Sequence, residues 1–201
     1  MKKIIVFNGI HGAGKSTMAR LFVERNQGFA YFPEIGGQLR QEVSYNAFQS
    51  KEDFDLEVMK RELARDKQLL IDPKSPVVET WHIGNMAYIL ARNPHLFPSY
   101  QEAFNKQLLL FHPTAILLDI AWDTFRSRAT EKIASDQVDR LIAFYQEVLE
   151  NTVKIYGQFD IPYFRVKNEG NLHESIEIIG ENLIHKGLFI DGATSNKESS
   201  V

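Results

Sequence analysis

The chain has 201 residues, of which 44% are hydrophobic and 24% are charged, and its formal net charge is −3 at pH 7. This length predicts a single sizeable domain, and the charge balance lacks the basic excess that nucleic-acid-binding domains carry. The apolar runs are shorter than the roughly 20 residues of a membrane span and cysteine is absent, so we expect a cytoplasmic protein with no membrane or nucleic-acid partner and no disulfide or thiolate chemistry.

The first predicted element is a buried parallel strand, because the run from Lys3 to Phe7 is short, continuous and β-branched. We expect no signal peptide here, since the apolar run is too short for one. Residues Gly9 to Ser16 follow as GIHGAGKS and match G-x-x-x-x-G-K-[ST] at every position. From Lys15 onward, apolar residues recur at three- and four-residue spacing, which predicts a helix.

A strand, a glycine-rich loop and a helix in this order predict a phosphate-binding loop. Glycines let backbone N–H groups wrap a phosphate chain, and the helix adds the positive end of its dipole. Lys15 would contact the β- and γ-phosphates of a nucleoside triphosphate, and the Ser16 hydroxyl would bind Mg²⁺. The alternative is a glycine-rich turn without a ligand. The candidate nucleotide-binding residues of the loop are Gly9, His11, Gly12, Ala13, Gly14, Lys15 and Ser16.

A second strand is predicted at residues 29–32, followed by PEIGGQLR. Gly36 and Gly37 permit a close approach of the backbone, while Glu34 and Arg40 offer a carboxylate and a cation. Alone, this segment is typical of a solvated turn. Beside a phosphate-binding loop, it favours recognition of a substrate by Glu34 and Arg40.

Residues 51–71 predict a helix, because charged and apolar residues alternate at helical spacing, and residues 75–80 predict the third strand. Glu79 lies near the end of this strand, where a buried carboxylate is costly unless it meets a metal ion, a cation or a donor. It would hold Mg²⁺ through water or accept a proton from the attacking hydroxyl, or else be a structural carboxylate. Trp81 and His82 come next, and would either contact a substrate base or pack in the core.

Two helices, around residues 82–92 and 99–111, precede the fourth and clearest strand at residues 113–120. Asp119 lies near the end of this strand and resembles the acidic residue of a second magnesium motif. We prefer Glu79 as the single metal carboxylate, since neighbouring strand ends do not both supply it. Asp119 would then cap the next helix.

The segment FRSRATEKIASDQVDR places Arg126 and Arg128 near a break between two predicted helices. An exposed basic segment of this kind can close over ATP as a lid and neutralise charge on the transferring phosphoryl group. Residues two apart do not share a helix face, so we expect one of these two arginines to be catalytic. The alternative is a solvated helix face, because acidic residues are interspersed.

The strongest helix pattern covers residues 136–156, and Gly157 stands where a C-terminal glycine belongs. A fifth strand at residues 163–167 leads to a helix that an Asn-x-x-Glu cap opens and that ends near Gly187. Short apolar strands separated by helices predict a mostly parallel sheet covered on both faces, with ligands beyond the carboxyl ends of the strands. We expect one domain over residues 1–188 and a disordered C-terminal tail over residues 189–201.

Four segments resemble, in order and spacing, parts of the thymidylate kinase and deoxynucleoside kinase group of P-loop nucleotide kinases: GIHGAGKST, PEIGGQLR, VVETWH, and AILLDI with the later RSR and DR. The resemblance covers residues 3–186. It implies an α/β fold of the P-loop NTPase type, a three-layer sandwich with a five-stranded parallel sheet in the order 2-3-1-4-5, helices on both faces and a helical lid. It also implies phosphoryl transfer from ATP–Mg²⁺ to a nucleoside, a nucleoside monophosphate or a similar small molecule, and a homodimer.

The resemblance further implies that Thr17 joins the loop residues in binding the donor, that Glu34 and Arg40 face the acceptor, and that Arg128 is the better aligned lid arginine. Thr80 stands where these kinases have an arginine after the strand-end acid, and this leaves the identity of the acceptor open. Two alternatives to a kinase stay open. They are a nucleotide-binding regulatory NTPase and a degenerate kinase-like protein with little transfer activity.

Overall fold

The computed structural model describes residues 1–43, 52–131, 134–168 and 171–185. Its strands form one five-stranded sheet in the order β2-β3-β1-β4-β5, and every neighbouring pair is parallel. This confirms the order expected from the resemblance. The strands are β1 (Lys2–Asn8), β2 (Phe29–Phe32), β3 (Ser75–Glu79), β4 (Phe111–Asp119) and β5 (Tyr163–Lys167).

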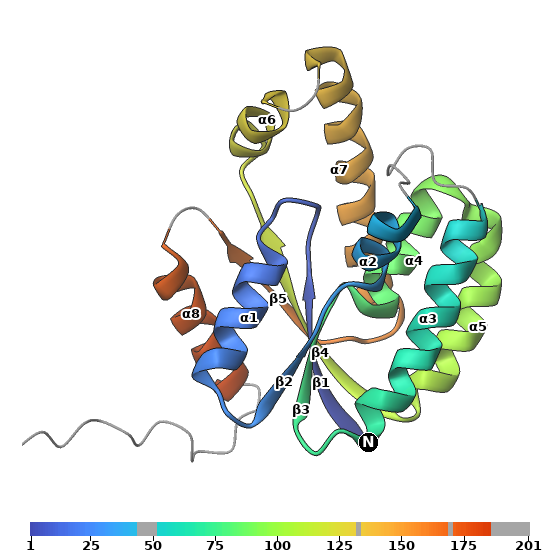
Figure 1. Cartoon of the computed structure of the whole chain (residues 1–201), viewed down its shortest axis with the longest axis vertical. Coiled ribbons are helices and arrows are strands. Elements are labelled where there is room, and N and C mark those ends of the chain that lie inside the picture. Colours follow the sequence, from blue (N-terminus) through green and yellow to red (C-terminus); the bar gives the residue numbers. More distant parts are fainter. Residues whose placement is uncertain (44–51, 132–133, 169–170, 186–201) are drawn as a thin grey trace, which may run out of the picture.

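Helices cover both faces of the sheet, which gives the three-layer arrangement (Figure 1). On one side lie α1 (Lys15–Arg25) and α8 (Leu172–His185), and on the other lie α3 (Glu52–Ile71), α4 (Trp81–Arg92), α5 (Phe97–Leu108) and most of α7 (Ser135–Gln158). The short 3₁₀ helix η1 (Pro94–Leu96) joins α4 to α5. Above the carboxyl ends of the strands stand α2 (Ile35–Val43), α6 (Trp122–Thr130) and the first turns of α7. No helix in these described ranges is both long and apolar enough to cross a membrane.

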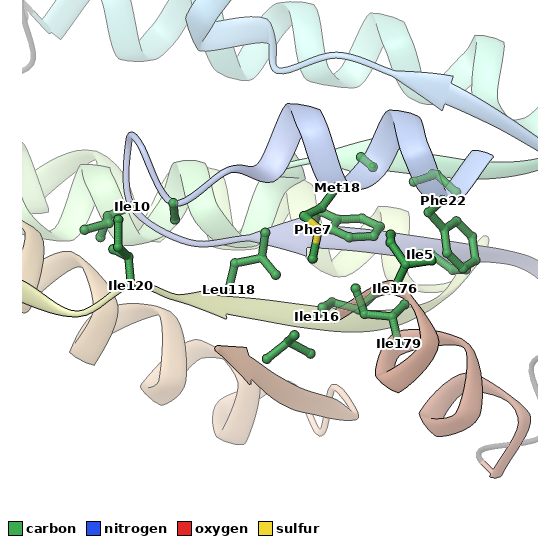
Figure 2. Packing of buried hydrophobic residues seen from close by; sticks show 14 of the residues in the cluster. Ile5, Phe7, Ile10, Met18, Phe22, Ile116, Leu118, Ile120, Ile176 and Ile179 are labelled. Carbon is green, nitrogen blue, oxygen red and sulfur yellow. The ribbon is translucent and has the colours of Figure 1, made fainter. Parts of the chain in front are cut away.

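Alternation along β1 divides the core into two layers. Ile5 and Phe7 pack with Met18 and Phe22 of α1, as Figure 2 shows, while the intervening Ile4 and Val6 join the layer formed by α4 and α5. A strand buried on both faces needs apolar residues at every position, and β1 meets this need from Ile4 to Phe7. The sheet is therefore fixed from both sides, and its carboxyl edge is a rigid platform for the loops above it.

Two local details differ from the sequence analysis. Residues 35–43 form helix α2, so the alternative of a solvated turn in this segment does not hold. Gly157 lies inside α7 and does not end it, because Asp160 adopts the left-handed conformation instead, with φ 51°. The amide of Ile161 donates to the carbonyl of Tyr156 at 2.9 Å and that of Asp160 to Gly157 at 3.5 Å, which is the Schellman arrangement.

The cap of α8 is confirmed on its asparagine side. The side-chain oxygen of Asn171 accepts from the amides of His173 at 3.1 Å and Glu174 at 3.3 Å. The expected end of this helix near Gly187, and the tail over residues 189–201, lie outside the described residues.

Candidate active site

The loop between β1 and α1 adopts the conformation that its glycines allow. Gly9, Gly12 and Gly14 all have positive φ, at 143°, 82° and 89°. A Cβ on Gly9 would lie 2.7 Å from the carbonyl oxygen of Leu118, and one on Gly14 would lie 2.2 Å from the side-chain nitrogen of Asn168. A side chain at Gly9 would collide with the backbone, and one at Gly14 would displace the Asn168 side chain, and both positions have a positive φ that favours glycine.

Lys15 folds back over this loop from the first turn of α1. Its Nζ donates to the carbonyl oxygens of Gly9 at 3.1 Å and Ile10 at 3.2 Å, and lies 3.7 Å from the Glu34 carboxylate. The side chain is only 7% exposed. The cation is thus held at the mouth of the loop, where the N-terminus of α1 already favours negative charge.

The remaining candidate residues of the loop differ in exposure. Ala13 is buried, whereas the exposed ones are His11, Gly12, Ser16 and Thr17. The carbonyl of Ala13 accepts a hydrogen bond from the Asn168 side chain at 2.8 Å. Asn168 follows β5 directly, so a residue from the far edge of the sheet ties down the loop. This contact was not predicted, although a polar residue just beyond the carboxyl end of a strand was the available signal.

Ser16 and Glu79 meet at the carboxyl edge of the sheet. The Ser16 hydroxyl donates to Oε2 of Glu79 at 2.8 Å, and the Tyr31 hydroxyl donates to Oε1. Glu79 is 2% exposed, so each oxygen of this buried carboxylate has a donor. Burial, followed by the hydrogen bond to Glu79, raises the pKa of Tyr31.

This pair fits a magnesium ion by its chemistry. Mg²⁺ prefers hard oxygen ligands and is usually bound through one or two protein groups plus substrate phosphates. A hydroxyl and a carboxylate beside a phosphate-binding loop supply that donor set. Within the described ranges there is no cluster of three or more His, Cys, Asp or Glu side chains that would make an all-protein metal site.

Asp119 stands apart from this pair. Its Oδ2 lies 3.4 Å from a guanidinium nitrogen of Arg165 on the neighbouring strand β5. Ala121 is the N-cap of α6 and no side chain caps that helix, so the expected role of Asp119 as a cap is wrong. The geometry favours Glu79 over Asp119 as the metal carboxylate.

Glu34 lies between the loop and α2, with a cation on each side. Arg40 Nη2 donates to its Oε1 at 2.8 Å, and Lys15 approaches its Oε2. Burial acts to raise the pKa of Glu34, but the attraction of Lys15 and then of Arg40 outweighs it, so the pKa lies below its usual value. Glu34 is therefore ionised at neutral pH.

Two tyrosines and a second arginine lie near Glu34 and Arg40. Tyr88 of α4 and Tyr145 of α7 contact each other edge to face at 6.5 Å between ring centroids. Burial is the main cause that raises the pKa of Tyr145 to about 12, and the charges of Arg40 and Glu34 also act on it. The guanidinium of Arg92 lies 5.2 Å from the Tyr88 ring centroid.

Arg92 is paired with Asp55 of α3, which is 2% exposed. Its Nε donates to both Asp55 oxygens, at 3.2 and 3.0 Å, and its Nη2 donates to Oδ1. Its third nitrogen, Nη1, is buried and makes no hydrogen bond within the residues that the structure describes. After the role that the resemblance implies for Glu34 and Arg40, we use the name acceptor-side group for Glu34, Arg40, Tyr88, Arg92 and Tyr145.

Trp81 and His82 are not part of this group. Both side chains are completely buried, and Trp81 packs edge to face on Phe104 and Phe111 at 5.4 and 5.5 Å. Their ring N–H groups meet Asp66 of α3 rather than a ligand-facing surface. The expectation that they contact a substrate is corrected here, and the alternative of core packing holds.

The two lid arginines have different partners. Arg128 of α6 reaches the carbonyl oxygen of Gly12 in the loop, at 3.4 Å from its Nη1. Arg126 instead pairs with Asp139 of α7 at 2.6 Å. Only Arg128 therefore approaches the phosphate-binding loop, which matches the distinction drawn from the resemblance.

A hollow of about 300 Å³ lies between the end of β2, α2 and α3. It is lined by Phe32, Pro33, Ile35, Gln38, Arg61, Ala64, Arg65 and Gln68. Because neither Lys15 nor Glu79 lines it, we locate the candidate site by the loop and its charged neighbours rather than by this hollow.

Comparison with known proteins gives structural matches only. No protein-family model and no curated protein matches the amino-acid sequence. Deoxyadenosine kinase from M. mycoides, with the products dCMP and dCDP bound, has a TM-score of 0.62 and 18% identity, over 91% of this chain and 99% of that one.

Two further solved structures are similar. Thymidylate kinase from Candida albicans has a TM-score of 0.65 and 14% identity, over 93% of both chains. NadR protein in complex with NR also has a TM-score of 0.65 and 14% identity, over 90% of this chain and 50% of that one. At these identities the likeness establishes the fold, and the chain has the P-loop kinase fold of these proteins.

Proposed function

We propose that the protein is an ATP-dependent kinase that transfers a phosphoryl group to a nucleoside, a nucleoside monophosphate or a similar small molecule. The observation that carries the proposal is the contact of Lys15 with Glu34, 3.7 Å from Nζ to Oε2. The lysine belongs to the phosphate-binding loop and the carboxylate to the acceptor-side group. A donor site and an acceptor site that adjoin at this distance suit direct transfer.

The residues take the following roles in this proposal. Lys15 and the loop amides bind the phosphates of ATP, and Arg128 offsets negative charge on the transferring group. With a hydroxyl acceptor, its oxygen bonds to the γ-phosphorus, while the bond from that phosphorus to the β–γ bridging oxygen breaks and ADP leaves. The hydroxyl proton goes to a carboxylate oxygen of Glu34, which is already ionised at neutral pH. With a monophosphate acceptor, a phosphate oxygen forms the bond to the γ-phosphorus instead and no hydroxyl proton is lost.

Ser16 and Glu79 would hold Mg²⁺, which when bound supplies positive charge to the phosphate oxygens. Tyr31 supports this pair, because its hydrogen bond to Glu79 leaves the second carboxylate oxygen for Ser16. Arg20 lies over the Tyr31 ring at 5.2 Å and helps to fix it. These contacts orient Glu79 before any ligand binds.

The acceptor would occupy the region bounded by the acceptor-side group. The half-buried Tyr88 ring lies there, with Tyr145 packed against it at 4% exposure, and Arg92 has a buried nitrogen without a hydrogen bond among the described residues. Thr80, where both kinase groups have arginine, is 3% exposed and gives no cation at this position. The choice between a nucleoside and a nucleoside monophosphate is therefore left to the transfer assay.

The test is a transfer assay with radiolabelled ATP, Mg²⁺ and a panel of nucleosides, nucleoside monophosphates and small hydroxylated metabolites. We expect labelled product with one class of acceptor, and loss of that product in a Lys15→Ala variant. Lys106→Ala is the matched control, because Lys106 is 69% exposed on α5, where it pairs with Glu102. Slow hydrolysis of ATP without transfer to any acceptor would instead favour the regulatory NTPase or the degenerate kinase-like protein.

A further inference from the structure

The turn after β3 has a strained backbone. Thr80 has φ 65° and ψ −53°, and Trp81, the next residue, has φ 47°. Positive φ is costly for a residue with a Cβ and most of all for a β-branched one. The buried Thr80 hydroxyl also makes no hydrogen bond within the described ranges. Such backbone strain is costly and persists only where the surrounding structure holds the residue in place.

This turn sets the direction of Glu79. The amide of Thr80 donates to the carbonyl of Phe7 at 2.9 Å, and the Thr80 carbonyl accepts from the Gly84 amide at 3.0 Å. The chain therefore leaves the sheet and enters α4 within one residue. Any relaxation of the turn would rotate the end of β3 and move the Glu79 carboxylate away from Ser16.

The turn is anchored from α3 by one buried carboxylate. Asp66 Oδ1 accepts from Trp81 Nε1 at 2.9 Å, and Asp66 Oδ2 meets His82 Nε2 at 2.6 Å. The other nitrogen of His82 meets the Tyr100 hydroxyl at 3.0 Å. The two oxygens of Asp66 thus hold two consecutive residues of one strained turn.

Burial of the Asp66 carboxylate opposes folding. Asp66 is 1% exposed and both of its partners are fully buried, and burying a carboxylate costs several kcal/mol unless its bonds compensate. Aromatic packing of Trp81 on Phe104 and Phe111 would by itself fill the same space. The polar anchor adds a fixed direction for the turn, which apolar packing does not give.

We propose that Asp66 is a positioning residue. It holds the strained turn at Thr80 and Trp81, and through the turn it holds Glu79 where Glu79 and Ser16 bind the Mg²⁺–nucleotide complex. This inference rests on the proposed function, because it presumes that Mg²⁺ and a nucleoside triphosphate bind at this site. Asp66 touches neither ligand, and its influence passes only through the turn.

The test compares Asp66→Asn with Leu69→Ala. Leu69 lies on the same helix, is fully buried and joins the same core layer, but has no polar contact with the turn. For each protein, calorimetry gives the Kd for ATP with Mg²⁺ and with EDTA, and the ratio of the two measures the coupling to Mg²⁺. Thermal unfolding gives the stability of each variant.

We expect Asp66→Asn to reduce the Mg²⁺-dependent gain in ATP affinity about tenfold, as outer-shell substitutions do at metal sites. The affinity in EDTA should stay unchanged, because the phosphate-binding loop is untouched. Leu69→Ala should lower the melting temperature through its cavity but keep the wild-type ratio. A role of Asp66 that was only structural would make the two variants behave alike.

The outcomes separate this inference from the function on which it rests. If the wild type does not bind ATP, the proposed function falls, and this inference with it. If the wild type binds ATP with a clear Mg²⁺ gain and Asp66→Asn keeps that gain, the positioning role alone is overturned. Should Asp66→Asn fail to fold, Trp81→Phe decides the question, since it removes the Nε1 donor while Asp66 keeps its bond to His82.

Discussion

The two halves of the candidate site are built in different ways. The donor half consists of consecutive residues of one loop, and its shape comes from glycine backbone angles and from carbonyl oxygens that Lys15 contacts. The acceptor half consists of Glu34, just before α2, and of side chains from α2, α4 and α7, and its charges neutralise one another, as Glu34 and Arg40 do. In the proposed function this loop would bind the donor phosphates, so the choice of acceptor would depend on the acceptor half.

The largest effect should come from the donor half. Lys15→Ala removes the cation that would contact the transferring phosphates, and we expect kcat to fall about 100-fold to 1,000-fold. Glu34 would also lose one of its two cations, so the KM for the acceptor should change as well. Steady-state kinetics with ATP and the preferred acceptor measure both constants. Full transfer by Lys15→Ala would place the donor site elsewhere.

Two arginines of helix α6, Arg128 and Arg126, allow a sharper test of the donor half. Arg128→Ala should lower kcat at least about tenfold, because a donor aimed at developing charge is worth that much or more. Arg126→Ala should leave kcat nearly unchanged and cost at most about 1 kcal/mol of stability, because its partner Asp139 is exposed. Equal losses of kcat in the two variants would contradict the assignment of Arg128.

The donor half and the sheet could be predicted because their signals are local. The motif from Gly9 to Ser16 needs eight consecutive residues, and the strands are short apolar runs whose parallel order follows from the helices between them. The pairing of Ser16 with Glu79 also followed from these signals. Both residues lie at the carboxyl edge of neighbouring elements, where parallel strands bring their ends together.

Glu34 and Arg40 of the acceptor half were expected from the sequence, but Tyr88, Arg92 and Tyr145 were not, because their contacts join residues far apart in the chain. Asp55 and Arg92 are 37 residues apart, and nothing in either segment indicates the other. Trp81 and His82 were misplaced for the same reason, since their partner Asp66 lies in the preceding helix. The residues after β2 show a related limit, because Gly36 and Gly37 by themselves are typical of a turn, whereas the segment forms α2 and packs against α3.

Thr80 lies between β3 and α4, and its strained backbone should affect the free energy of unfolding. Glycine tolerates φ 65° without cost, and Thr80→Gly also removes a buried hydroxyl that has no partner. The added freedom of the unfolded chain and the lost methyl group oppose these gains. We expect the free energy of unfolding to rise by about 1 kcal/mol, as measured by urea denaturation. A clear loss of stability would mean that the Thr80 side chain holds the turn rather than straining it.

The smallest predicted effect tests whether the acceptor half neutralises its own charge. The folded-state pKa of Glu34 is lowered, so ionised Glu34 adds stability above its unfolded pKa, and this stability is lost as the pH falls through the lowered folded value. The advantage of the wild type over Glu34→Gln in free energy of unfolding should therefore be full at pH 7 and shrink below about pH 4.

Glu102→Gln is the control, because Glu102 also pairs with a lysine but is 74% exposed. Its pH-dependent difference should be near zero in 0.15 M salt, where exposed pairs are screened. If Glu34→Gln behaves like Glu102→Gln, then Lys15 and Arg40 are not held by Glu34 and are available to a charged acceptor, which would favour a nucleoside monophosphate as the substrate.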